Sequence, residues 1–143
     1  MYDELYKAYT DNNVLMASPM QLVVALYRGA IEAVEQARHA LATEDIMGRS
    51  KFVCKAVDIL GELLGSLDHE KGGEVSQRLA SLYCYMQRRI LEGHTRQADA
   101  PLAEVCSLLA TLLEGWDAIA GPADVPSAGA EHNPDDHSFV ETF

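Results

Sequence analysis

The chain contains residue types that could catalyse a reaction or bind a metal, but their spacing matches no known catalytic or metal-binding pattern. None of the five histidines belongs to an HExxH pair, and the Glu-x-x-His arrangement of a di-iron bundle is absent. No glycine-rich phosphate loop, dinucleotide fingerprint or GxSxG turn occurs. The stretch DHEKGGE at 68–74 lacks the alternating ligands of an EF-hand and is interpreted as a turn between helices. We therefore expect no enzyme activity, no bound metal and no cofactor.

The three cysteines, Cys54, Cys84 and Cys106, are widely spaced and form no CxxC or Cys/His pattern. Each falls within an apolar helical pattern, where a free thiol behaves as a small hydrophobic side chain. An odd number of free thiols fits a reducing compartment.

The charge of the chain is strongly negative, at −11 over 143 residues. Residues 1–117 hold 17 acidic and 11 basic side chains, and residues 118–143 hold 5 acidic and no basic ones. This balance argues against nucleic-acid binding, which depends on lysines and arginines that neutralise phosphates. Arg88 and Arg89 are interpreted as part of a solvated helix face.

The sequence also gives no sign of a membrane span or an export signal. No apolar run reaches the roughly 20 residues that a spanning helix requires. The N-terminal stretch MYDELYKAYTDNN carries acidic residues and has no apolar segment of the kind found in secretory signals. We expect a cytoplasmic protein without membrane insertion.

The elements that must position any functional residue are four long helices. Ser18 and Pro19 form a strong helix start, since serine caps free amides and proline suits the first helical position. The predicted helices run from there to about Thr43, over 46–67, over 74–94, and from Asp99, as the cap, to about Ala120. Short connections make neighbouring helices antiparallel, so the fold class is all-α, an up-down four-helix bundle. Residues 1–120 form the bundle domain.

Two terminal segments lie outside these helices. Residues 2–10 form a short amphipathic helix, with Tyr2, Leu5, Tyr6 and Tyr9 on one side, that either covers an apolar surface or completes the fold. Residues 121–143 are acidic and rich in Pro, Gly and Ala, which predicts a disordered tail. Its apolar tip, Phe139, Val140 and Phe143, could dock on the protein or on a partner, although an unattached tail is the default interpretation.

The predicted helices differ in how much of their circumference is apolar. At 100° per residue, the arc is about 100° in the third helix, about 160° in the second and fourth, and about 200° in the first. We do not expect a single bundle core to bury the whole apolar arc of the first helix. This arc contains Leu22, Val23, Val24, Leu26, Tyr27, Ala30, Ile31 and Val34. We expect the surplus to be covered by the N-terminal segment, by a second copy or by a partner chain.

Four stretches of the chain resemble the FliS family, the export chaperones of flagellin. They are KAY at 7–9, SPMQLVVALYRGAI at 18–31, SLDHEKGGEVSQRLASLYCYMQRRILEG at 66–93 and EVCSLLATLLEGW at 104–116. The chain departs from the family pattern at Gly93-His94, where Ala-Asn is usual, and at Cys84, where an acid or asparagine is common. We expect these departures on or near the outer surface of the third helix.

The resemblance implies a helical bundle that binds the disordered C-terminal region of flagellin, prevents its premature polymerisation and delivers it to the flagellar type III export apparatus. The export gate and a co-chaperone are further partners that it implies. It also implies that the N-terminal segment covers a hydrophobic site and shifts when flagellin binds, which favours a covering role for Tyr6 and Tyr9.

The predicted partner-binding residues lie on the apolar arcs, where an amphipathic client helix would dock. They are Tyr6, Tyr9, Leu22, Val24, Tyr27, Ile31, Val57, Leu64 and Leu108. Within the first helix, Tyr27 and Ile31 are expected on the outer part of the arc and Leu26 in the core. The alternative is a structural bundle that buries the same faces by homodimerising, so the oligomeric state is either a monomer or a weak homodimer.

Overall fold

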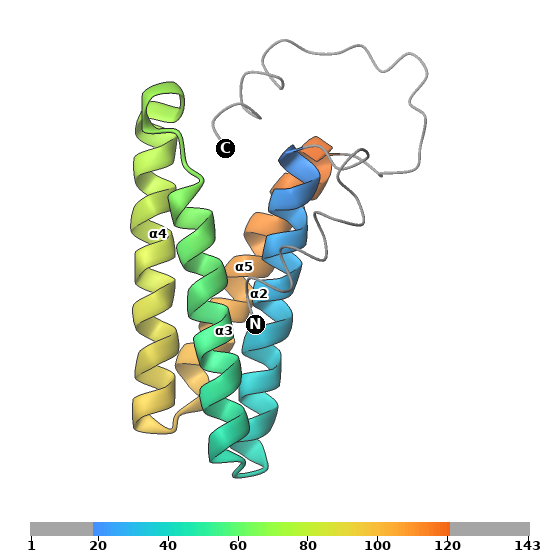
Figure 1. Cartoon of the computed structure of the whole chain (residues 1–143), viewed down its shortest axis with the longest axis vertical. Coiled ribbons are helices and arrows are strands. Elements are labelled where there is room, and N and C mark those ends of the chain that lie inside the picture. Colours follow the sequence, from blue (N-terminus) through green and yellow to red (C-terminus); the bar gives the residue numbers. More distant parts are fainter. Residues whose placement is uncertain (1–18, 121–143) are drawn as a thin grey trace.

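The computed structural model describes residues 19–120, which form four helices (Figure 1). They are α2 (Pro19–Ala42), α3 (Ile46–Gly65), α4 (His69–Arg96) and α5 (Asp99–Ala120). Consecutive helices run antiparallel, so the predicted all-α up-down bundle is confirmed. The expectations for the capping residue Ser18, the N-terminal segment and the tail after Ala120 lie outside the described residues.

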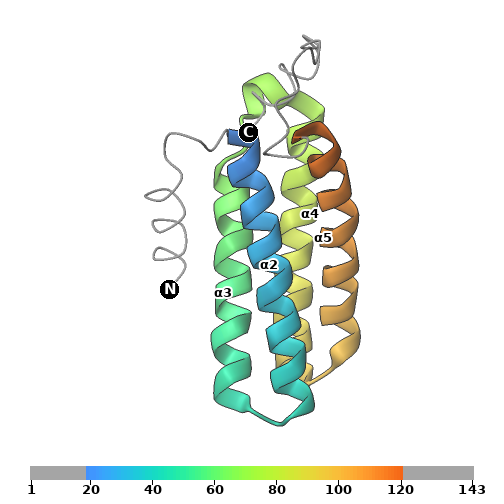
Figure 2. The same ribbon diagram turned by 90° about the vertical axis from the view of Figure 1, so that its right-hand side faces the viewer.

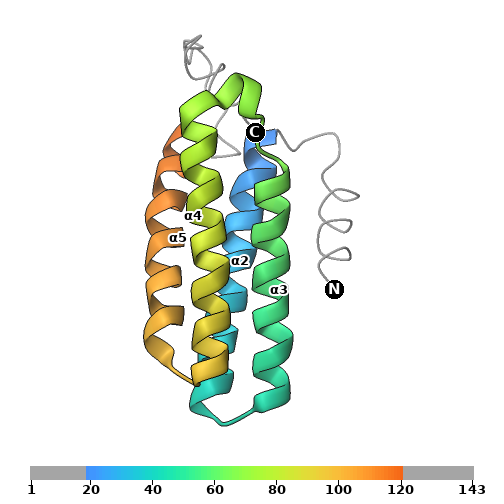
Figure 3. The ribbon, with the colours of Figure 1, turned by 90° about the vertical axis from the view of Figure 1, so that its left-hand side faces the viewer.

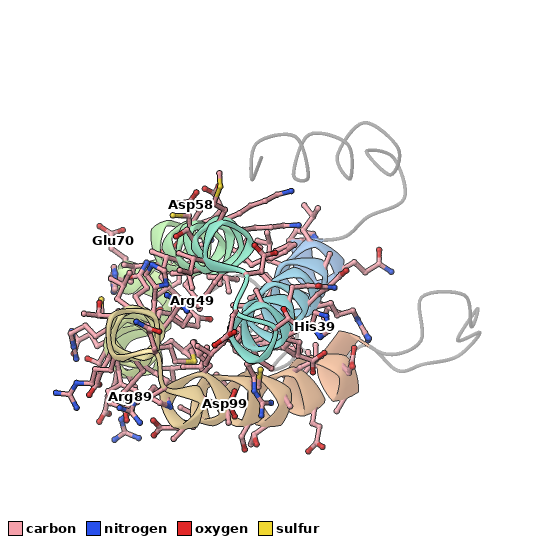
Figure 4. The ribbon with its side chains drawn as sticks, turned by 90° about the horizontal axis from the view of Figure 1, so that it is seen from below. His39, Arg49, Asp58, Glu70, Arg89 and Asp99 are labelled. Carbon is pink, nitrogen blue, oxygen red and sulfur yellow. The ribbon has the colours of Figure 1, made fainter. Side chains whose placement is uncertain are left out.

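The four helices occupy the corners of a square (Figure 4). Helices that follow one another in the chain pack together, and α5 closes the ring by packing against α2. Figure 2 shows α2 between α3 and α5, and Figure 3 shows α4 between α5 and α3. Packing is most extensive between α2 and α3 and least extensive between α4 and α5.

Local chemistry fixes the ends of the helices. The Asp45 side chain accepts a hydrogen bond from the amide of Gly48 at 2.9 Å and so caps the start of α3. A Cβ at Gly48 would lie 2.2 Å from that carboxylate, so the cap requires glycine there. Gln97, directly after α4, takes the left-handed conformation that commonly ends a helix, so α4 ends at Arg96.

The stretch DHEKGGE contains more helix than the sequence predicts. Asp68 caps the amides of Glu70 and Lys71, and the helix begins at His69 rather than at Glu74. Gly73, with φ +52° and ψ −124°, then breaks the helical path, so the first turn points away from the axis of the rest of α4 (Figure 3). The expected turn is therefore one capped helical turn followed by a glycine kink.

The core of the bundle is built around aromatic side chains from three helices. Tyr27 of α2 and Tyr83 of α4 are fully buried, and their hydroxyl oxygens lie 2.6 Å apart. The Trp116 ring of α5 lies against Tyr27, with ring centroids 6.2 Å apart. These contacts connect the diagonal pair α2 and α4 through the centre of the square. After Tyr27, four of the five buried residues of α2 are alanines, which allow α3 to approach closely.

None of the helices within residues 19–120 is both long and apolar enough to cross a lipid bilayer.

Candidate partner-binding surface

Ion pairs close the two sides of the bundle that α5 shares with its neighbours. Arg28 and Arg38 of α2 form bidentate pairs with Asp117 and Asp99 of α5, at distances between 2.7 and 3.0 Å. Across the α4–α5 side, the Glu104 carboxylate accepts hydrogen bonds from Tyr85 at 2.8 Å and from Arg89. Figure 4 labels Arg89, from the α4–α5 side, and Asp99, from the α2–α5 side.

These contacts shift the protonation equilibria of the acidic partners. The Arg38 guanidinium, by hydrogen bonding, holds the pKa of the Asp99 carboxyl below its usual value. The hydrogen bond from Tyr85, together with that from Arg89, likewise lowers the pKa of Glu104. Both carboxylates are therefore ionised at neutral pH and keep α5 attached to the bundle.

The side between α3 and α4 is different, because no ion pair within the described residues joins these two helices. Gln87 of α4 donates a hydrogen bond to the carbonyl of Val57 at 3.1 Å. Near the end of the bundle, Ser50 lies 3.5 Å from the Nε2 atom of His94. These two contacts fix the register of the antiparallel pair, and residues at helical spacing from them line the same side.

We name this side the α3–α4 face. It consists of Ser50, Cys54, Val57, Gly61 and Leu64 of α3 and of Ala80, Cys84, Gln87 and Leu91 of α4. None of the nine residues is charged, in a chain in which 23% of residues are. Charged residues flank the α3–α4 face, with exposed Asp58 on α3 and exposed Arg88 on α4 at its solvent edges.

Most residues of the α3–α4 face are small and only partly covered. Cys54 is exposed, and Val57 and Leu64 are half-buried against the core. Leu91 is 47% exposed, although it is a large apolar residue. A Cβ built at Gly61 would meet only the end of Gln87, at 3.6 Å. Such a surface allows a further helix to approach closely and to bury apolar area without stranding a charge.

The α4–α5 side also has partly buried apolar residues, and it serves as the comparison. Val75, 43% exposed, and Leu82 lie at seven-residue spacing from Arg89, so they face α5. This side, however, is bridged by Arg89 and Glu104 and flanked by the ion pair of Arg78 with Glu74. A docking helix would have to displace or desolvate these charges, which costs free energy.

The structure distributes the sequence-predicted binding residues over several sides of the bundle. Val57 and Leu64 lie on the α3–α4 face. Leu108 is half-buried four residues after Glu104, and thus on the α4–α5 side. Val24 and Ile31 are half-buried at the α5 edge of α2, near Arg28, whereas Leu22 lies on the opposite edge of that helix. Tyr6 and Tyr9 lie outside the described residues.

The expectation that Tyr27 lies on the outer part of the α2 arc is wrong. Its side chain is 0% exposed and hydrogen-bonds with Tyr83 in the centre of the bundle. The reason is that Tyr27 points to the centre of the bundle, where it contacts Tyr83 of α4 and Trp116 of α5. Most of the apolar arc of α2 that was expected to remain outside the core is buried within the bundle. Leu26, expected in the core, is buried as predicted.

Among the positions that depart from the family pattern, Gly93 differs from expectation. Gly93 is buried rather than near the outer surface, and a Cβ there would lie 2.9 Å from Leu102 of α5. His94 is half-buried and accepts a hydrogen bond at Nδ1 from the buried Arg49, at 3.0 Å. Arg49 lies between α3 and α4 in Figure 4. Cys84 belongs to the α3–α4 face.

The sequence analysis missed Cys54, Ala80, Cys84 and Leu91 as members of a candidate docking surface. The cysteines were interpreted as small hydrophobic side chains, and Leu91 falls outside the main apolar stripe of its helix. The available signal was the absence of charge on two facing helix edges, which becomes visible only when the register of α3 against α4 is known.

No group of three or more histidine, cysteine, aspartate or glutamate side chains within the described part of the chain is placed to hold a metal ion.

Comparison with known proteins gives one consistent family. A family model described as "Flagellar protein FliS" matches residues 2–123. The flagellar secretion chaperone FliS of Salmonella typhimurium is 37% identical over 122 residues, which cover 82% of this chain and 90% of the relative. FliSB of Pseudomonas aeruginosa is 38% identical over 104 residues, 73% of this chain and 82% of the relative. FliS of Campylobacter jejuni is 34% identical over 111 residues, 78% of this chain and 87% of the relative.

Proposed function

The chain belongs to the FliS family of flagellar secretion chaperones, and from this premise we propose that it binds the disordered C-terminal region of flagellin in the cytoplasm. Bound flagellin cannot polymerise prematurely and is delivered to the flagellar type III export apparatus. The export gate and a co-chaperone are the further partners of this cycle.

The observation that carries the proposal is the uncharged α3–α4 face. A disordered client loses conformational entropy when it folds on its chaperone, so the surface that receives it must supply extensive apolar burial. The α3–α4 face offers exposed Leu91 towards one end, half-buried Val57 near its middle and half-buried Leu64 towards the other end. We assign it as the main seat for an amphipathic helix of flagellin.

The other predicted residues contribute contacts beyond this seat. Leu22, Val24, Ile31 and Leu108 are each half-buried at the edges of other sides. An extended client that continues around the bundle would cover them in turn. Tyr6 and Tyr9, in the N-terminal segment, are proposed to cover apolar surface until flagellin arrives.

The test compares two matched substitutions in α4. Leu91 and Val75 have similar exposure, 47% and 43%, but only Leu91 lies on the α3–α4 face. Calorimetry with the C-terminal peptide of flagellin from the same organism should show one-to-one binding by the wild-type protein. Leu91→Asp should weaken that binding at least about tenfold, which is a loss of roughly 1.4 kcal/mol, and Val75→Asp should leave it nearly unchanged.

Two results would count against the proposal. No binding by the wild-type protein would refute the client. Equal weakening by both substitutions, with helicity unchanged in circular dichroism, would refute the α3–α4 face as the main seat. A dimer that persists at low micromolar concentration in the presence of the peptide would support the structural-bundle alternative.

A further inference from the structure

The charges of the chain are divided unevenly between its parts. Residues 46–96, which contain α3 and α4, hold eight basic and six acidic side chains. Residues 99–120, which form α5, hold four acidic and no basic ones, and residues 121–143 hold five acidic and no basic ones. The helices α3 and α4 therefore form the part of the molecule with a positive balance, and the C-terminal segment is its most acidic part.

Cations without an ion pair are available beside the α3–α4 face. Arg88 is exposed on α4, four residues after Cys84 and three before Leu91, and the ion pairs of the described residues do not include it. Exposed Asp58 holds the equivalent position on α3, four residues after Cys54 and three before Gly61. Lys55 of α3 is half-buried and likewise outside the ion pairs of the described residues. An acidic segment would be repelled by α5, from which it emerges, and attracted to the α3–α4 pair.

The end of the acidic segment has the composition that the α3–α4 face would accept. The last five residues, FVETF, place Phe139, Val140 and Phe143 after a stretch with few large apolar residues. Aromatic rings of this kind bury large apolar area and fit against small residues such as Gly61 and Ala80. The apolar composition of the tip thus complements the α3–α4 face.

The length of the segment allows this contact. The 18 residues from 121 to 138 span up to about 60 Å when extended, whereas the 28 residues of α4 correspond to a helix of about 42 Å. The last described residue, Ala120, lies at the same end of the bundle as the start of α4 (Figures 1 and 2). From there the tip can reach any point on the α3–α4 face.

We propose that the C-terminal tip, Phe139–Phe143, docks on the α3–α4 face of its own chain and competes there with the client. This regulation rests on the proposed function, since it concerns the same seat. A tethered segment has an effective concentration on the order of 1 mM, so a contact with a dissociation constant of about 0.3 mM covers the face most of the time. Flagellin, which offers more area, displaces the tip.

Cys54 provides a reporter that needs no client. It is exposed on α3, between the two residues that contact α4, so a docked tip would shield its thiol. The experiment follows alkylation of the full-length protein by iodoacetamide, with the labelled cysteine identified by mass spectrometry. The double variant Phe139→Ser/Phe143→Ser should label Cys54 about fourfold faster than wild type, as the estimated contact strength implies.

Two control variants separate the tip from other covers. Val125→Ser changes an apolar residue of the same tail outside the tip and should label at the wild-type rate. Tyr6→Ser/Tyr9→Ser tests the N-terminal segment. If that variant exposes Cys54 and the tip variant does not, the N-terminal segment is the cover and the proposal is overturned.

The remaining outcomes also decide the question. Equal labelling of the wild-type protein and the tip variant shows that the tip does not dock and overturns the proposal. Protection that increases with protein concentration assigns the cover to a second copy and overturns it as well. Faster labelling of the tip variant, together with a flagellin peptide that does not bind, would retain the docked tip and reject the proposed client.

Discussion

Tyr27 and Ile31 lie one helical turn apart on α2, and yet their surroundings differ. Tyr27 is enclosed by Tyr83 and Trp116, whereas Ile31 is half-buried at the edge that faces α5. Burial raises the pKa of the Tyr27 hydroxyl, although the hydrogen bonds from Tyr83 and Trp116 oppose the shift. The hydroxyl is therefore neutral and held at the centre of the bundle.

Replacement of Tyr27 by aspartate should unfold the protein. The carboxylate would be enclosed in the core without a cation within reach, and an unpaired buried charge costs several kcal/mol, a large part of the stability of a small domain. Loss of the helical signal in circular dichroism at 25 °C checks this expectation. Ile31→Asp is the control, because its side chain can reach water and should leave most of the helicity intact.

The sequence could predict that Tyr27 belongs to an apolar arc, but not where it lies within the arc. Helical spacing gives the angular width of an apolar surface from one helix alone. Which part of that surface is covered depends on how many helices pack against it, and α2 has two such neighbours. The same limit applies to Gly93, which only the approach of Leu102 identifies as buried.

At the scale of elements, α4 is a helix with a built-in change of direction. Its first turn is held by the Asp68 cap and by a hydrogen bond from the Ser76 hydroxyl to the Asp68 carbonyl at 3.1 Å. Gly73 connects this turn to the long part of the helix in a conformation with positive φ. The break depends on a residue without a side chain.

Gly73→Ala should destabilise the protein by about 1 kcal/mol or more, because the added methyl group strains the backbone at positive φ. Space is not the cause, since nothing lies within 4 Å of a Cβ built there. Urea unfolding checks the prediction through a lower midpoint with an unchanged slope. Gly65→Ala is a suitable control, because it also has open space but lies in α3 without positive φ.

An unchanged or higher midpoint for Gly73→Ala would show that α4 can straighten without cost. The existence and order of the helices were predictable from capping residues, proline and glycine, whose effects are local. The helical turn before Gly73 was not predictable, because two adjacent glycines indicate a turn. The spacing of residues does not show that Asp68 caps a helix there.

At the scale of the whole molecule, α5 buries apolar side chains in the core and is also joined to its neighbours by three carboxylates. Asp99 and Asp117 pair with α2, and Glu104 pairs with α4. The pKa values of Asp99 and Glu104 are lowered in the folded protein, so folding is favoured while these groups are ionised. That stability is present above the unfolded-state values of about 4 and is lost as the pH falls through the folded-state values.

Acid should therefore loosen the attachment of α5 before it affects the contact between α2 and α3. The urea midpoint of the wild-type protein should fall between pH 5 and pH 2. In the double variant Asp99→Asn/Glu104→Gln the midpoint should start lower at pH 7 and change less over the same range. If both proteins show the same pH dependence, other groups control acid stability.

The candidate site was only partly accessible to sequence reasoning. Val57 and Leu64 could be selected, because each belongs to the apolar arc of its own helix. The α3–α4 face as a whole could not, since its uncharged character is a property of two helix edges brought together by a register that the hydrogen bond from Gln87 to Val57 reveals.

The even number of antiparallel helices places the start of α2 and the end of α5 at one pole of the bundle (Figure 2). The opposite pole carries the connections at residues 43–45 and 97–98. A fluorophore, surface linker or affinity tag inserted at that pole would sit far from where both terminal extensions begin. If single molecules were attached to a surface through that pole, both terminal extensions would stay free to be displaced by a binding partner during the measurement.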